Sequence, residues 1–141
     1  MNMKLNFLLY VGMFSLASLG LSACQPSLAP LYAPTTTAGI HSSGASYTAN
    51  EIKAAVLSGL QAKNWHLVTT KEGRIEAETT SGRHTARVVV SYNASGWSIG
   101  YISSSPGLKY QHDPQHGTII HRRYNHWIRM LNEAIGHALV S

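Results

Sequence analysis

The sequence predicts a two-layer α+β domain in which two helices cover one face of a four-stranded antiparallel meander sheet, in the order α-β-β-β-β-α. Three observations predict this fold. A helical repeat begins after Thr48, four alternating segments follow it, and a longer helical repeat closes the chain. The predicted domain covers residues 48–141, and it is long enough to bury a core without disulfides.

The first predicted helix starts at a capping signal. Thr48 and Glu51 have the spacing of a capping box, in which the two side chains satisfy amides of the first turn. Small and apolar residues then recur at helical spacing up to about Asn64 and predict one buried face. These residues are Ile52, Ala55, Val56, Gly59 and Leu60.

Four segments of alternating apolar and polar residues come next, and short turn sequences separate them. A turn at residues 81–82 predicts that Ile75 lies opposite Val88. A turn at residues 94–95 predicts that Val88 also lies opposite Tyr101, so that one face stays apolar across three strands. The segments are residues 65–70, 74–81, 84–93 and 97–104.

The C-terminal part of the chain predicts a loop over residues 105–117 and a helix over residues 118–139. The apolar residues of this segment fall on one helical stripe, which we expect to pack on the apolar face of the sheet. They are Ile120, Tyr124, Trp127, Ile128, Leu131, Ala134, Ile135 and Ala138.

The N-terminal residues 1–23 are typical of a secretory signal peptide, because one Lys precedes an apolar run that is shorter than the ~20 residues of a membrane-spanning helix. The run ends in Leu21-Ser22-Ala23-Cys24, which resembles a bacterial lipobox. This resemblance implies cleavage between Ala23 and Cys24 and attachment of a diacylglycerol and an acyl chain at Cys24. Gln25 follows Cys24. An Asp at this position retains Gram-negative lipoproteins in the inner membrane, so the resemblance implies that this protein is anchored in the outer membrane, where we expect it on the periplasmic face.

Residues 24–47 read as the lipidated Cys followed by a tether, because they are rich in Pro, Ala, Ser and Thr and show no helical or strand period. An alternative is that the few apolar residues of this stretch dock on the domain. Those residues are Leu28, Leu31, Tyr32 and Ile40.

Composition argues against an enzyme. The chain has 11 Lys and Arg, 6 Asp and Glu and 8 His, and its formal charge is +5. A single Cys excludes an internal disulfide, Asp113 is the only Asp, and no motif marks a nucleophile. We therefore expect no enzyme and no cofactor apart from the lipid. The export signal makes nucleic acid an improbable partner.

One candidate metal site comes from residues near the second predicted helix. Imidazole and carboxylate ligands suit Zn²⁺, Cu²⁺ or Ni²⁺, and a flexible loop could bring them together. The alternative is that they are ordinary polar loop residues. The candidate ligands are His112, Asp113, His116 and His121.

A basic stripe follows on the helix itself. Arg122, Arg123, His126 and Arg129 lie mostly three to four residues apart, away from the apolar stripe. Such a stripe can meet anionic envelope components, such as lipid headgroups or lipopolysaccharide, or an envelope protein. The alternative is a solvated helix face without a partner.

The motif Ile120-His121-x-x-Tyr124-Asn125-x-Trp127-Ile128 resembles an uncharacterised family of small proteobacterial lipoproteins. Trp65, the strand at residues 74–77, the segment Tyr92 to Tyr101 and Leu108-x-Tyr110 extend the resemblance over most of the domain. The resemblance implies no activity. The motif is either a structural anchor or part of a ligand pocket lined by Tyr101, Tyr110, His121, Tyr124 and Asn125.

The sequence as a whole therefore predicts a lipid-anchored protein of the bacterial envelope whose domain binds a partner without catalysis. The alternative function is a periplasmic module that binds a small ligand or a metal through the loop and helix histidines.

Overall fold

A computed structural model describes residues 27–141 of the chain. The predicted signal peptide, the cleavage after Ala23 and the lipidation of Cys24 lie outside the described residues. The fold is α+β, as expected, but its strands form two antiparallel sheets rather than one meander. The helices are α1 (Ala49–Ala62) and α2 (Arg122–Val140).

The larger sheet has five strands in the order β2-β6-β5-β4-β3. The smaller sheet has three strands in the order β1-β8-β7, and a short 3₁₀ turn, η1 (Pro106–Leu108), connects β6 to β7. The strands of the larger sheet are β2 (Thr35–Thr37), β3 (His66–Lys71), β4 (Arg74–Ser81), β5 (His84–Asn93) and β6 (Gly96–Ser104). Those of the smaller sheet are β1 (Leu28–Pro30), β7 (Gln111–Asp113) and β8 (Gly117–His121).

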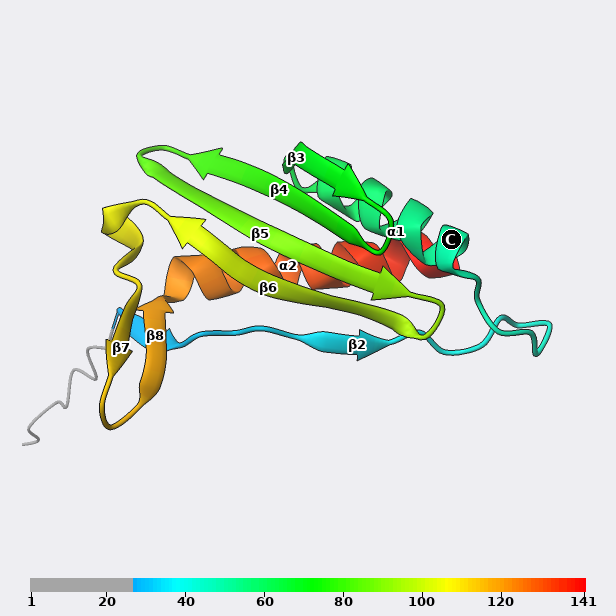
Figure 1. Cartoon of the computed structure of the whole chain (residues 1–141), viewed down its shortest axis with the longest axis horizontal. Coiled ribbons are helices and arrows are strands. Elements are labelled where there is room, and N and C mark those ends of the chain that lie inside the picture. The colour runs from blue at the N-terminus through cyan, green and yellow to red at the C-terminus, as the bar shows by residue number, and fades with distance from the viewer. Residues whose placement is uncertain (1–26) are drawn as a thin grey trace, which may run out of the picture.

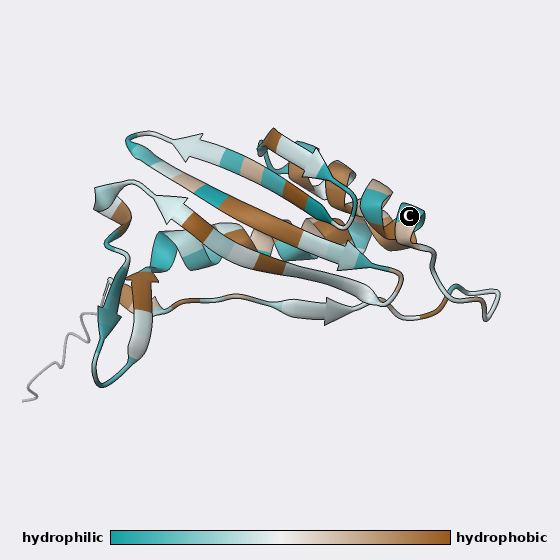
Figure 2. Ribbon diagram, in the orientation of Figure 1, coloured by the Kyte–Doolittle hydropathy of each residue, from teal (hydrophilic) through white to brown (hydrophobic). Residues whose placement is uncertain are grey.

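Both helices lie on the same side of the five-stranded sheet, behind it in the view of Figure 1. Their buried residues and the inward residues of β4, β5 and β6 form one hydrophobic core. Figure 2 shows the most apolar stretch of the sheet near the middle of β5, which contains Val88 and Val90. The helices approach each other closely at Gly59, where an added Cβ would lie 2.8 Å from the backbone nitrogen of Ile135. The packing of α1 on α2 thus requires a glycine at this position.

Helix α1 confirms the prediction made for it. The amide of Glu51 donates to Thr48 Oγ1 at 3.2 Å, and the amide of Thr48 donates to Glu51 Oε2 at 2.8 Å, so the capping box is closed. The hydrogen bond from the backbone amide of Thr48 also holds the pKa of Glu51 below its ordinary value. The buried face consists of the five residues that the helical spacing identified.

One of the two predicted registers is confirmed and the other is wrong by two residues. Val88 lies opposite Tyr101 in the β5–β6 pair, as expected. In the β4–β5 pair, however, Ile75 lies opposite Val90 instead of Val88, because the turn lies at residues 82–83. A shift of two residues keeps every side chain on its original face, since strands alternate with a period of two. The predicted apolar face is therefore correct despite the wrong register.

The C-terminal helix starts later than predicted. Residues 118–121, expected to be helical, lie in strand β8 (Gly117–His121), and α2 begins at Arg122. Part of the predicted loop forms β7, which pairs with β8 in a hairpin. The two β-branched residues Ile119 and Ile120 suit a strand, and β1 on the other side of β8 supplies the second row of hydrogen bonds. Ile120 is still fully buried, because the strand delivers it to the same core.

The tether prediction is wrong for the stretch from residue 27 to residue 38, which we call the strap. Its strand β1 pairs with β8, and its strand β2 pairs with the edge of β6. Leu31 and Tyr32 pack against the core, so the docking alternative is confirmed for these two residues. Ile40 does not dock, since 67% of its surface is exposed.

The strap comes so close to β6 that it requires a glycine there. A Cβ on Gly96 would clash with the carbonyl oxygen of Thr36, and the φ angle of Gly96 is +149°. Only glycine tolerates both the contact and the backbone conformation. The start of β6 is therefore adapted to pair with the strap.

Candidate functional site

Asn125, a residue of the predicted ligand pocket, holds the strap onto α2. Its side chain is almost completely buried, with 2% of its surface exposed. The amide of Tyr32 donates to Asn125 Oδ1 at 2.9 Å, and Asn125 Nδ2 donates to the carbonyl oxygen of Pro30 at 2.8 Å. Both functional ends of this side chain are used by the strap, which makes Asn125 a structural anchor.

A second asparagine, two helical turns further along α2, repeats this arrangement. Asn132 Oδ1 accepts hydrogen bonds from Thr36 Oγ1 at 3.0 Å and from Trp97 Nε1 at 2.8 Å. Residues seven positions apart lie on the same side of a helix. Asn125 and Asn132 thus fix the strap along α2, and sequence analysis identified the first of them but not the second.

The three tyrosines of the predicted pocket pack on one another. The rings of Tyr101 and Tyr110 stack with their centroids 4.0 Å apart, and Tyr124 meets Tyr101 edge-on at 5.6 Å. Tyr124 is 1% exposed, and this burial raises the pKa of its hydroxyl. The hydroxyl of Tyr101 lies 2.8 Å from Ser104 Oγ. The structure brings these pocket residues together, but as an aromatic cluster that joins β6 to α2.

His121 caps helix α2. Its Nδ1 accepts a hydrogen bond from the amide of Arg123 at 3.1 Å. Partial burial lowers the pKa of His121, and the nearby charges of Arg123, Lys109 and His84 lower it further. The direction of this shift favours the neutral ring, whose Nδ1 can accept the capping hydrogen bond.

The four candidate metal ligands do not converge. Within residues 27–141, no three His, Cys, Asp or Glu side chains are close enough to hold one ion. Asp113 Oδ1 instead accepts hydrogen bonds from the amides of Gln115 and His116 and lies 2.9 Å from the Nδ1 of His116. The hydrogen bonds from these two backbone amides hold the pKa of Asp113 below its ordinary value, and the one from Gln115 has the largest effect. Asp113 thus closes the β7–β8 turn, while His112 lies on β7 and His121 lies at the helix cap.

The basic stripe is exposed on α2, as predicted, with Arg122, Arg123, His126 and Arg129 all at the surface. Arg129 lies over the ring of Tyr32, 5.1 Å from its centroid, and so contributes to holding the strap. The backbone amide of Arg122 donates to the carbonyl oxygen of Ser27 at 2.9 Å. The start of the stripe and the start of the strap therefore lie together.

Two further cations come to the same end of the molecule, and sequence analysis missed both. Arg83 lies in the β4–β5 turn, and Lys109 follows η1 in a left-handed conformation with a φ angle of +54°. The turn is held against η1, because the amide of Thr85 donates to Ser105 Oγ and the ring of His84 lies against Gly107. Figure 1 shows the turn, η1, the β7–β8 hairpin and the start of α2 at one end of the domain. We call this end, with Arg83, Lys109, Arg122 and Arg123, the basic end.

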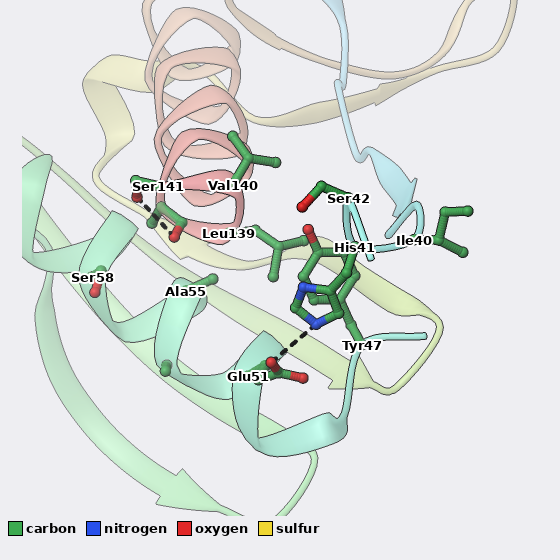
Figure 3. A pocket seen from close by; sticks show the side chains of 12 residues that line it. Ile40, His41, Ser42, Tyr47, Glu51, Ala55, Ser58, Leu139, Val140 and Ser141 are labelled. Atoms are coloured by element: carbon green, nitrogen blue, oxygen red, sulfur yellow. Dashed lines mark hydrogen bonds and ion pairs between the residues drawn. The ribbon is translucent and has the colours of Figure 1, made fainter. Parts of the chain in front are cut away.

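A cavity of about 520 Å³ lies at the opposite end, between α1, the C-terminus of α2 and residues 40–47. Figure 3 shows the ring of His41 pointing toward Glu51, and its Nε2 is 3.0 Å from Glu51 Oε1. The same ring packs on Tyr47 with a centroid distance of 3.9 Å. These contacts attach the segment that follows the strap to the start of α1, and they explain the position of His41 without a ligand.

Comparisons of the chain with protein-family models, with curated proteins and with solved structures found no match. Within residues 27–141, neither helix is both long enough and apolar enough to cross a lipid bilayer.

Proposed function

We propose that the protein is a lipid-anchored lipoprotein of the bacterial envelope, held on the periplasmic face of the outer membrane, and that its domain acts by binding rather than by catalysis. The observation that carries this proposal is the position of Ser27. Ser27 lies three residues after Cys24, and its carbonyl oxygen accepts a hydrogen bond from the backbone amide of Arg122, which fixes Ser27 to the start of α2. A lipid on Cys24 would thus hold a rigid domain at the membrane surface.

Binding is favoured over catalysis by the use of the polar side chains. Asn125, His121 and Asp113 are the residues that a reaction or a ligand site would most readily employ, and each of them already bonds to backbone groups of the fold. The exposed groups of the basic stripe are suited to contacts with anions at a surface. The proposed partner is therefore an anionic component of the envelope.

The anchor is tested with the full chain in a Gram-negative host. We expect the N-terminal peptide of the mature protein to begin at Cys24 and to carry the mass of a diacylglycerol and an acyl chain. Cys24→Ser is expected to abolish the lipid and to weaken the membrane association. Ser22→Ala, which keeps a small residue before the cut, is expected to change neither.

The membrane is identified by separating inner and outer membranes on a density gradient. The wild type is expected with the outer membrane, and Gln25→Asp is expected to move the protein to the inner membrane. A Cys24 that carries no lipid in the wild type would contradict the anchor. Co-fractionation of wild type with the inner membrane would contradict the proposed location.

A further inference from the structure

We propose that the basic end of the domain is a docking surface for anionic phospholipid headgroups and that it sets the orientation of the domain on the bilayer. This inference rests on the proposed lipid anchor and adds the surface that contacts the membrane. It places the cavity beside His41, at the opposite end of the domain, away from the bilayer.

The chain between Cys24 and Ser27 is short. Three residue steps separate Cys24 from Ser27, and even a fully extended chain covers at most about 11 Å over that distance. A lipid attached to Cys24 therefore keeps Ser27 within about 11 Å of the headgroup layer. This distance is close to the Debye length of about 8 Å at physiological ionic strength, so charges near Ser27 interact with the surface.

The strap gives the domain little freedom to turn the basic end away from the membrane. Ser27 accepts a hydrogen bond from the amide of Arg122, and the amide of Leu31 donates to the carbonyl oxygen of Thr118 at 2.9 Å. Asn125 bonds to the strap at Pro30 and Tyr32, on either side of Leu31. A long flexible tether would let any face of the domain contact the bilayer. Because the strap is bound to α2 and β8, the basic end, where Ser27 lies, is the part of the domain that is held toward the bilayer.

The charge of the basic end complements an anionic surface. The basic end carries Arg83, Lys109, Arg122 and Arg123 and one acidic residue, Asp113, which is engaged at the hairpin turn. The rest of the described chain has six Lys and Arg residues and five Glu residues, so its charges nearly cancel. The excess of positive charge is therefore concentrated at the basic end. Each basic residue near an anionic bilayer raises the partition coefficient of a protein onto that bilayer about fivefold. Anionic phospholipids are thus the surface that this end matches.

The proposal is tested on the chain from residue 24 onward with Cys24→Ser, which keeps every residue of the described fold and removes the anchor. Binding is measured by co-sedimentation with vesicles of phosphatidylcholine that contain or lack phosphatidylglycerol. Lys109→Gln with Arg123→Gln removes two charges from the basic end, and both side chains are exposed. Lys53→Gln with Lys71→Gln removes the same charge from α1 and from the far tip of β3. Circular dichroism confirms that each variant is folded.

We expect binding only to vesicles that contain phosphatidylglycerol. The Lys109 and Arg123 substitutions should weaken the partition coefficient about 25-fold, and the Lys53 and Lys71 substitutions should change it less than twofold. Equal losses in the two double variants, or binding that does not depend on phosphatidylglycerol, would overturn the docking surface. Because this measurement uses the unlipidated chain, its failure leaves the lipid anchor intact, and an unlipidated Cys24 in cells would leave the vesicle result intact.

Discussion

The helix-and-sheet body and the strap are stabilised in different ways. The body, formed by α1, α2 and strands β3 to β6, buries a continuous core of apolar side chains. The strap adds few core residues and depends on hydrogen bonds to Asn125 and Asn132, which lie more than 90 residues away in the sequence. The body should therefore unfold as one unit, while the strap can open locally at a lower free energy. The difference matters for function, since the strap connects the body to the proposed anchor.

The largest effect is expected from a cavity in the body. Ile128 is fully buried between α2 and the sheet, and Ile128→Ala should lower the free energy of unfolding by about 3 kcal/mol. Urea denaturation followed by circular dichroism measures this loss. Val140→Ala on the same helix is the matched control, because Val140 is 77% exposed and its truncation should cost less than about 0.5 kcal/mol. Equal losses would mean that the core is not where the structure places it.

The next largest effect is expected in the strap alone, when Asn125 is replaced. Asn125→Ala leaves the amide of Tyr32 and the carbonyl group of Pro30 without a partner, at a cost of about 2 kcal/mol. Hydrogen exchange should show faster exchange at the amides of Leu31 and Tyr32 and unchanged protection in α1. Asn50→Ala, at an exposed position in the first turn of α1, is the control and should leave the strap protected. Uniform loss of protection in α1 and the strap would show that the two regions are one cooperative unit.

A smaller effect, confined to the body, is expected at the capping box. Thr48→Ala removes the side-chain acceptor for the amide of Glu51 and should cost about 1 kcal/mol. Thr48→Ser keeps the hydroxyl and should recover most of the loss. Thermal unfolding measures both variants, and the strap amides should exchange at the wild-type rate in each.

The smallest effect appears only on acidification. The pKa of His121 is lower in the folded protein than its ordinary value of 6.5, so the unfolded chain binds more protons in the window just below pH 6.5. Protonation of His121 therefore destabilises the fold as the pH falls through this window. His121→Asn keeps a good N-cap and removes the titration, so the variant should match the wild type at pH 7.5 and be more stable at pH 5.5. Urea midpoints at the two pH values test this, and an equal loss in both proteins would contradict it.

The candidate site was predictable to the extent that it lies on one helix. Arg122, Arg123, His126 and Arg129 follow from the helical period, and the structure leaves them exposed. Arg83 and Lys109 lie in loops without a period, so no sequence pattern could assign them to the same end of the molecule. For the motif from Ile120 to Ile128 the sequence left a structural anchor and a ligand pocket as alternatives, and the contacts of Tyr124, His121 and Asn125 are those of an anchor, because these residues pack, cap α2 and hold the strap.

The sequence by itself determined the elements whose signals are local. The capping box, the buried face of α1, the extent of β4 and β5 and the pairing of β5 with β6 all depend on residues close together in the chain. Only the tertiary structure decided the fate of residues 27–38 and 118–121, because partners far away in the chain hold both stretches in place. The strap pairs with β8, and Asn125, Asn132 and the edge of β6 hold the strap. They convert an expected tether into a rigid link between the domain and its proposed anchor.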